Sequence, residues 1–554
     1  MKIDLQSYSA CNGELPPLCA TLIETIRATT TVERFIEELN RARDLQAVLG
    51  KTELSRWADV LNRCDEILED ATVIQDYEMK VDRCATTKYH TISILRFTGL
   101  LFDCTSTRRI YASTDRIIRL TECTDMDLIG EVLRLLQTIS KRSKFLTQRL
   151  CPEDQASLVM SLTAMAQCWG GKLRNLKMED CVRSDVKLPP LFPFTFTDSK
   201  AKHTMIFERH MVRVSSLLHF VFHGQFAKGM IPEDRYSLLA RIRMLRNFET
   251  REHRMQCLIV RLLSISTLIY CRCQPDDVQI GALLYSGFIE EAVALLKVDL
   301  NSHELMDPIQ TEALRMLCSV VSLEKASRTS QILDVLSAGS YHGFLAVFTR
   351  NIVEDMKRNA LNTAGKPSVA LSTALLSFIY HLSNNDPGGE TLAACGLTQT
   401  LLSVISHHAL PLDQATLATR CTRITDNFTT VDVTGFNNCK GMEICIDRLI
   451  YEVDECRKEQ PFVIDTSGDV DDESVGNVFV RAPVIGKTCH PQRSGLIKAL
   501  ITFIKRAIQD AQFQDSVRHS KFVLAISRNC PRDTLCYLHE YDKYVRGIAS
   551  SRRG

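Results

Sequence analysis

Two short motifs in this chain of 554 residues come close to sites with known chemistry. Gly486-Lys487-Thr488 matches the end of a phosphate-binding loop, but Arg481 stands where that loop needs its first glycine, so backbone amides cannot cradle a phosphate. His219 and His223 would share a helix face, as two ligands of a zinc metalloprotease do. Phe220 replaces the glutamate that acts as general base in such enzymes. Neither motif therefore predicts a nucleotide site or a catalytic zinc site.

The 21 cysteines show no zinc-binding pattern, because no two of them have the Cys-x-x-Cys spacing. Cys271 and Cys273 are two positions apart, and we interpret them as buried thiols at a helix end. A cysteine nucleophile is left open, since its activation needs a nearby histidine or positive field that a sequence does not display. The odd count, the scatter of the cysteines and an N-terminus without an apolar leader indicate reduced thiols, and hence the cytoplasm or the nucleus.

Two further segments contain histidine, and one is typical of a turn whereas the other is typical of a helix end. Tyr341-His342-Gly343 places a histidine beside a glycine, but no Gly-x-Ser-x-Gly motif accompanies it, and we interpret it as a turn. His407-His408 is interpreted as a helix end. The sequence thus predicts no catalytic, cofactor-binding or metal-binding residue, and no cofactor.

Two charged segments could bind partners, although the net charge of the chain is only +1. The Arg241–Arg254 ridge could hold an acidic peptide or phosphates, but Glu249 and Glu252 offset part of its charge, so we interpret it as a solvated outer face. Residues 465–487 are rich in Asp, Ser, Gly and Val, which predicts a mobile acidic loop. The ridge consists of Arg241, Arg243, Arg246, Arg251 and Arg254.

These segments must be carried by helices, because apolar residues recur at three- and four-residue spacing along the chain. With 24 glycines and 16 prolines, the chain is also poor in the turn residues that sheet-rich folds require. The clearest apolar stripes lie in residues 131–146, 309–321, 370–383 and 496–507. The longest charge-free stretch, residues 391–412, is interpreted as two short buried helices and not as a membrane span.

Three junctions between expected helices repeat one pattern, in which a glycine precedes an apolar residue: Gly287-Phe288, Gly343-Phe344 and Gly396-Leu397. Glycine is favoured where a helix ends in a left-handed residue. The glycines are 56 and 53 residues apart (343 − 287 and 396 − 343), longer than armadillo or HEAT repeats but of their order if loops are inserted. The predicted fold class is therefore all-α, an armadillo/HEAT-like α-solenoid.

One segment breaks the helical pattern. In residues 188–209 apolar and polar positions alternate on both sides of a polar loop, which predicts a small β-hairpin insertion near residues 190–209. The resulting organisation is helical repeats in 1–187, the hairpin in 188–209, armadillo-like repeats in 210–464, the acidic loop in 465–490, a continuing solenoid helix in 491–519 and a divergent tail in 520–554.

Eight blocks of sequence, in order, resemble the N-terminal region of the giant E3 ubiquitin ligases that carry HECT, UBA and WWE domains. They are Glu53–Leu68, Leu135–Leu150, Cys168–Lys172, Leu283–Glu291, Gly339–Asn351, Thr373–Gly396, Tyr451–Ile464 and Pro491–His519. The resemblance covers about residues 15–519. After His519 the chain departs from the family, and we interpret residues 520–554 as a truncation or splice end that would leave an uncapped, self-associating repeat.

The resemblance implies an armadillo-like scaffold that recruits protein substrates for ubiquitination and proteasomal turnover. In that family a C-terminal HECT lobe carries the cysteine that transfers ubiquitin, so this chain alone is expected to be inert. The expected partners are protein substrates and, in a full-length ligase, the HECT region; a membrane and nucleic acid are not expected. The alternative is a stand-alone armadillo-type adaptor.

Overall fold

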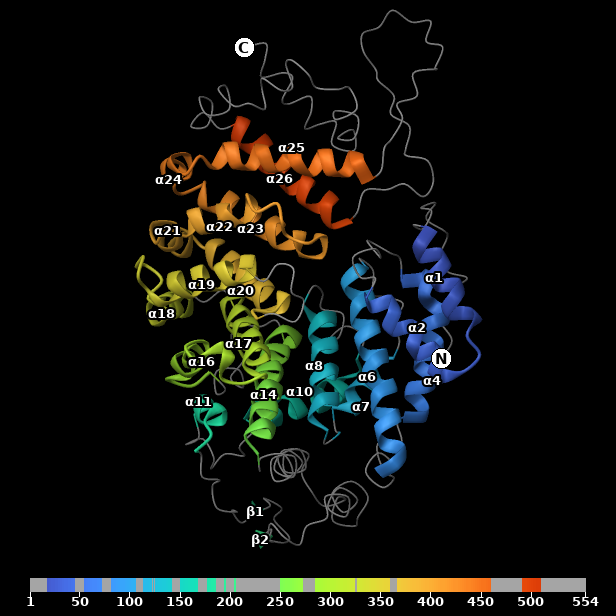
Figure 1. The fold of residues 1–554 in the computed structure, drawn as a ribbon. Helices are drawn as coiled ribbons and strands as arrows, with labels where there is room; N and C mark the ends of the chain where they lie inside the picture. The colour runs from blue at the N-terminus through green and yellow to red at the C-terminus, as the bar shows by residue number, and fades with distance from the viewer. Residues whose placement is uncertain are drawn as a thin grey trace, which may run out of the picture. The chain divides into compact units, whose positions relative to one another are not determined.

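The computed structural model describes residues 17–44, 54–71, 81–105, 113–141 except 122 and 124, 150–167, 177–185, 194–195, 204–205, 250–272, 284–323, 326–358, 366–459 and 491–509. The chain forms two compact units, residues 1–325 and 326–554 (Figure 1). Helices dominate both units, and the prediction of an all-α fold is confirmed at that level.

The helices of the first unit vary in length from short turns to α6, which has 24 residues. They are α1 (Pro17–Ala28), α2 (Val32–Asp44), η2 (Leu54–Trp57), α4 (Ala58–Ala71), α6 (Val81–Cys104), α7 (Thr114–Leu120), α8 (Met126–Ser140), α10 (Pro152–Gln167), α11 (Met178–Val182), α14 (Arg251–Arg272), α16 (Phe288–Leu296), η4 (Leu300–Ser302) and α17 (Met306–Val321).

Helix α14 is the centre of the first unit, because α8, α10, α11 and α17 all pack against it (Figure 1). Among the described helices it is the one long and apolar enough to cross a membrane, yet 89% of its apolar window is buried by these neighbours. Its apolar composition is therefore explained by a core position. Hydrogen bonds join it to α8: Gln137 Nε2 donates to Ser266 Oγ at 2.7 Å, and Ser140 Oγ lies 3.2 Å from Cys271 Sγ.

The second unit is also built from packed helices, the longest of which, α25 and α26, have 19 residues each. They are α18 (Ala326–Val335), α19 (Phe344–Arg358), α20 (Val369–Ser383), α21 (Asp386–Ala394), α22 (Leu397–Ile405), η5 (Leu412–Gln414), α23 (Ala415–Phe428), α24 (Val433–Asn438), α25 (Gly441–Glu459) and α26 (Pro491–Gln509). Helix α23 packs against α20, α22 and α26, and α26 also packs against α25. Buried aromatic rings fill this core; those of Phe436 and Phe503 meet edge to face at 5.5 Å.

The four apolar stripes found in the sequence correspond to α8, α17, α20 and α26, and each stripe is buried. The charge-free stretch of residues 391–412 falls on α21 and α22, as predicted. Helix α8 begins at a side-chain cap, since the carboxylate of Asp125 accepts hydrogen bonds from the backbone amides of Asp127 and Leu128.

The glycine junctions agree with prediction at two of three positions. Gly287 and Gly396 are left-handed, with φ of 88° and 79°, and they start α16 and α22. Gly343 is a correction, because the left-handed residue at that junction is Ser337, with φ of 49°. Gly343 is required for another reason: a Cβ atom there would lie 1.8 Å from the carbonyl oxygen of Ser337.

Two strands of two residues each lie within the segment for which a hairpin is predicted. β1 (Phe194–Thr195) and β2 (Thr204–Met205) pair antiparallel, with Phe194 opposite Met205. The remainder of that segment, the acidic loop 465–490 and the tail 520–554 lie outside the described residues. The division at residue 325 falls inside the block 210–464 that the sequence treats as one run of repeats.

Candidate interaction surface

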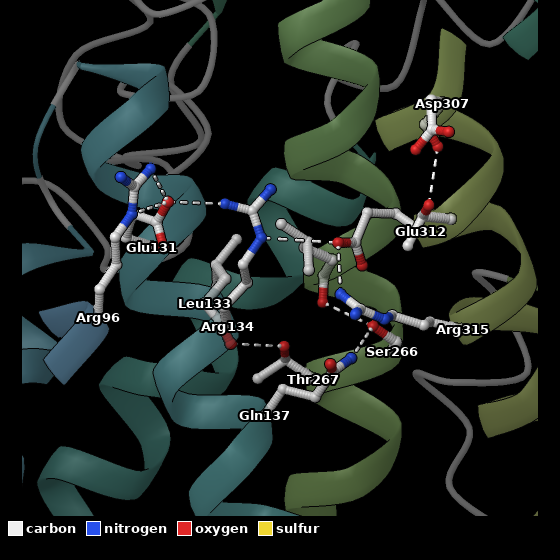
Figure 2. Close-up of polar contacts among 12 residues, drawn as sticks. Arg96, Glu131, Leu133, Arg134, Gln137, Ser266, Thr267, Asp307, Glu312 and Arg315 are labelled. Atoms are coloured by element: carbon white, nitrogen blue, oxygen red, sulfur yellow. Dashed lines mark hydrogen bonds and ion pairs between the residues drawn. The ribbon is translucent and has the colours of Figure 1, made fainter. Parts of the chain in front are cut away.

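Three arginines and two glutamates form a row across the first unit, which we call the arginine row: Arg96 on α6, Glu131 and Arg134 on α8, and Glu312 and Arg315 on α17 (Figure 2). Nε and Nη2 of Arg96 donate to Oε1 of Glu131 at 2.9 and 2.6 Å. Nη1 of Arg134 donates to the same oxygen at 3.0 Å. Each carboxylate of the row is therefore held by arginines from more than one position.

The second half of the row repeats this arrangement across a longer stretch of chain. Nη1 of Arg315 donates to Oε1 of Glu312 at 2.9 Å, and Nε of Arg134 lies 3.5 Å from the same oxygen. Arg134 is thus the central residue, because it pairs with both carboxylates. The other oxygen of Glu312, Oε2, is buried and accepts no hydrogen bond from the residues that the structure describes.

Exposure separates the two kinds of charge in the arginine row. The side chains of Arg96, Arg134 and Arg315 are 44%, 36% and 31% exposed, whereas those of Glu131 and Glu312 are 9% and 3% exposed. The carboxylates are buried and the guanidinium groups reach the surface, so the charge exposed to solvent is mainly positive. Such a surface favours anionic groups, which guanidinium binds with paired hydrogen bonds.

The arginine row was not predicted, although the sequence carries a signal for part of it. Glu131-Val132-Leu133-Arg134 and Glu312-Ala313-Leu314-Arg315 share the pattern Glu-x-Leu-Arg, and each is followed by two apolar residues. Within each copy the glutamate and arginine are three residues apart and share a helix face. Both copies lie on helices that pack against α14. The link between the copies, and the link to Arg96, depends on tertiary packing.

The Arg241–Arg254 ridge is only partly described, and its described part corrects the interpretation as a solvated face. Arg254 is 4% exposed, and its Nη2 donates to the carbonyl oxygen of Arg183 at 3.0 Å. Nε of Arg251 donates to the carbonyl oxygen of Val182 at 2.7 Å. Both arginines therefore fasten α14 to the C-terminal end of α11, where carbonyl groups lack helical partners. Arg241, Arg243 and Arg246 lie outside the described residues.

The histidine segments agree with their interpretation as a turn and a helix end. His342 follows Tyr341 in the turn before α19, and Arg350 lies 4.0 Å from the centre of the Tyr341 ring. His407 and His408 follow the end of α22, and His408 stacks on Tyr451 with ring centres 4.2 Å apart. His219 and His223 lie outside the described residues, as do Arg481 and Gly486-Lys487-Thr488.

A second charged cluster, in the second unit, is closed to solvent. Arg448, Glu452 and Arg493 are all buried. Nη1 of Arg448 donates to the carbonyl oxygens of Ile405 and His407 at 3.0 and 2.7 Å, which satisfies the C-terminal end of α22. Glu452 joins Arg448 to Arg493. This Arg448–Glu452–Arg493 cluster ties α22, α25 and α26 together and offers no exposed charge.

The described cysteines lie mainly in the core. Of the twelve whose side chains the structure describes, nine are buried, Cys104 and Cys439 are half-buried, and Cys151 is exposed. Cys271 is buried in the last turn of α14, as predicted, and Cys273 lies outside the described residues. Burial raises the pKa of the Cys445 thiol to about 12, and it raises the pKa values of Cys64 and Cys421 further. Within the described ranges no group of three or more His, Cys, Asp or Glu residues could hold a metal ion.

Comparison with known proteins finds relatives along nearly the whole chain. Residues 195–354 match a family model described as a Domain of Unknown Function (DUF908). The E3 ubiquitin-protein ligase HUWE1 of Mus musculus is 34% identical over 545 residues, which is 94% of this chain and 12% of the ligase. HUWE1 of Rattus norvegicus is 31% identical over 94% of this chain and 14% of the ligase.

A more distant relative is the E3 ubiquitin-protein ligase UPL2 of Arabidopsis thaliana, 22% identical over 76% of this chain and 12% of the ligase. The chain thus spans 12–14% of the length of these three relatives. Among solved structures, an engineered protein matches 96% of this chain and 98% of its own at 12% identity. Its TM-score of 0.35 is too low to argue for a shared fold.

Proposed function

Because this chain is related in sequence to the N-terminal region of the HUWE1-type E3 ubiquitin ligases, we propose that it forms the helical substrate-recruitment scaffold of a HECT-type ligase. The observation that carries the proposal is the 34% identity over 94% of the chain, combined with a coverage of only 12% of that ligase. In this proposal the region presents a binding surface, and ubiquitin transfer takes place in another part of the ligase.

The scaffold is proposed to be an armadillo-like solenoid. Two features support this: the Glu-x-Leu-Arg pattern on α8 and α17, and the left-handed glycines that start α16 and α22. In a solenoid each repeat packs on its neighbours, and equivalent positions of successive repeats line one continuous face. The arginine row is consistent with such a face, because it joins charged side chains from three helices, α6, α8 and α17.

The transferring cysteine is proposed to lie outside this chain. A ubiquitin thioester forms on an exposed, activated thiolate, whereas burial raises the pKa of the Cys64, Cys421 and Cys445 thiols and disfavours their thiolate forms. The proposed partners are protein substrates and the HECT region of the same ligase, acting in the cytoplasm and the nucleus.

The test has two arms. In the first, this chain is incubated with E1, E2 and ubiquitin, and we expect no dithiothreitol-sensitive ubiquitin adduct on it; formation of such an adduct would show an enzyme. In the second, residues 1–509 are removed from the full-length ligase. We expect the HECT thioester to form at the same rate and substrate ubiquitination to fall, and an unchanged rate for every substrate of the ligase contradicts recruitment.

The proposal is separated from a stand-alone adaptor by the size of the native protein. An immunoblot with an antibody against residues 491–509 should detect a chain of several hundred kilodaltons, and peptide mass spectrometry of that band should find HECT peptides. A band near 62.6 kDa without a larger species favours the adaptor.

A further inference from the structure

We propose that the arginine row binds an acidic, extended segment of a protein partner through the carboxylates of its Asp and Glu side chains. This inference rests on the proposed function and deepens it, because it names the chemistry by which the scaffold would recognise its partners. It is carried by the contacts and the exposure of Arg96 on α6, Arg134 on α8 and Arg315 on α17, which the intervening glutamates link in one row (Figure 2).

The arginines have donors left for a ligand. The described residues engage Nε and Nη2 of Arg96, Nε and Nη1 of Arg134, and Nη1 of Arg315. A guanidinium group carries five N–H donors, so each arginine retains at least one nitrogen that no described residue engages. Since the three side chains are 31–44% exposed, these donors can reach a carboxylate without rearrangement of the helices.

The buried glutamates hold the arginines in place before a ligand arrives. Glu131 fixes Arg96 and Arg134 from behind, and Glu312 fixes Arg134 and Arg315. A long side chain that is already ordered loses less rotamer entropy on binding, and this improves affinity without additional contacts. An isolated surface arginine such as Arg358, 72% exposed, has one partner, Asp355, and lacks this support.

Carboxylates suit this surface better than the phosphates of nucleic acid. The row holds three cations against two carboxylates, and the net charge of the whole chain is +1. Near the row, Lys88 is neutralised by Asp125 and Asp127, and Asp127 is 54% exposed. Nucleic acid requires a continuous basic track, since it presents a phosphate at every step. Discrete side-chain carboxylates can match a few spaced guanidinium groups and avoid the acidic neighbours.

The experiment measures binding of a fluorescein-labelled peptide of twelve residues with Asp or Glu at four spaced positions to the full 554-residue chain, by fluorescence anisotropy. The comparison peptide has Asn and Gln at those positions. The variants are Arg134→Gln and Arg96→Gln, and the control variant is Arg358→Gln in the second unit. Arg96→Gln is included because Glu131 keeps Arg134 as a partner, so folding is less at risk. Thermal unfolding of each variant verifies that it is folded at the temperature of the binding measurement.

We expect the acidic peptide to bind more tightly than its amide counterpart, and this difference should shrink with added salt. Arg134→Gln and Arg96→Gln should each weaken binding by about tenfold, whereas Arg358→Gln should change it less than about twofold. Equal binding of the two peptides overturns the inference, as does an equal loss in Arg358→Gln. Tighter binding of a duplex DNA of the same total charge, lost in the same variants, also overturns it in favour of nucleic acid.

The outcome is independent of the test of the proposed function. If the peptide fails to bind while deletion of residues 1–509 lowers substrate ubiquitination, the scaffold stands and the acidic-segment inference fails. If the peptide binds but deletion of residues 1–509 changes the ubiquitination of no substrate, the proposal of substrate recruitment is wrong. The arginine row is then a binding site without a role in recruitment.

Discussion

Arg448 and Glu452 are one helical turn apart on α25, and both guanidinium nitrogens Nε and Nη2 of Arg448 bind the same oxygen, Oε1 of Glu452, at 2.8 and 2.7 Å. The other carboxylate oxygen binds Arg493 on α26. All three side chains are buried, so Glu452 is a carboxylate shared by two buried guanidinium groups, and Arg448 also donates to the carbonyl oxygens of Ile405 and His407.

We expect Glu452→Gln to lower the free energy of unfolding of the second unit by about 3–5 kcal/mol, because two buried guanidinium groups lose their only carboxylate within the cluster. Differential scanning calorimetry of the full chain measures the change. Glu354→Gln is the matched control: Glu354 pairs with Lys357 at 3.0 Å but is 54% exposed, so we expect a loss below about 1 kcal/mol. Equal losses in the two variants would show that the buried cluster contributes no more to the free energy of unfolding than an exposed ion pair does.

Three glycines allow conformation and crowding to be separated. Gly343→Ala places a Cβ atom 1.8 Å from the Ser337 carbonyl oxygen, so the backbone must move, and we expect the largest destabilisation, above about 2 kcal/mol. Gly287→Ala meets nothing within 4 Å but keeps a φ of 88°, which should cost about 1–2 kcal/mol. Gly495→Ala, inside α26 and unobstructed, should stabilise the protein by about 0.5–1 kcal/mol. Urea unfolding tests this order, and any other order contradicts the geometry.

The helices were predictable because each carries its own signal. The stripes on α8, α17, α20 and α26 satisfy a local rule, that apolar residues at helical spacing are buried on one face. The prediction for Gly343 was wrong because glycine is required both where the backbone is left-handed and where another backbone comes close, as Ser337 does here. The sequence shows glycine in either case, and only the three-dimensional structure distinguishes the two reasons.

Acidification should destabilise the second unit through His407 and His408. Burial lowers the pKa of both below the ordinary value of 6.5, and the positive charge of Arg448 acts in the same direction. For His407, Lys357 lowers the pKa too; for His408, Glu452 and Asp447 oppose the decrease.

The unfolded chain therefore binds more protons than the folded chain as the pH falls below about 6.5, so the contribution to stability is complete above that pH and is lost below it. We expect the thermal midpoint of the double variant His407→Asn/His408→Asn to fall less between about pH 7.5 and pH 5.5 than that of the unsubstituted chain. Identical falls contradict the direction of these pKa shifts.

Thiol labelling should follow burial. A thiol with a pKa of about 12, as at Cys445, holds about a thousandfold less thiolate at neutral pH than one at the ordinary value of 9. We expect iodoacetamide to modify Cys151, which is exposed, and to leave Cys445 unmodified until the protein unfolds. Peptide mass spectrometry after brief labelling reads both sites at once. Rapid native modification of Cys445 would indicate an accessible, activated thiolate and would reopen the question of a nucleophile.

The arginine row was less predictable than the fold. Arg96 and Glu131 are 35 residues apart, and Arg134 and Glu312 are 178 apart, so no local pattern joins them. The two Glu-x-Leu-Arg copies marked half of the row, but their side chains meet only because α8 and α17 both pack on α14. The Arg241–Arg254 ridge shows the opposite error, in which a surface was predicted where a buried contact exists. The sequence predicts that Arg254 is a surface charge, but the side chain is buried against the end of α11.

The position of α14 also determines when the first unit can form during protein synthesis. Helices α8, α10 and α11 precede α14 and can wait for it, but α17 ends at residue 321, which is 49 residues after the end of α14 at residue 272 (321 − 272). At about 5–20 residues per second, the ribosome needs roughly 2–10 seconds to add that stretch. For an interval of that length after α14 has left the ribosome, the apolar face of α14 that α17 covers in the folded unit has no α17 to pack against it.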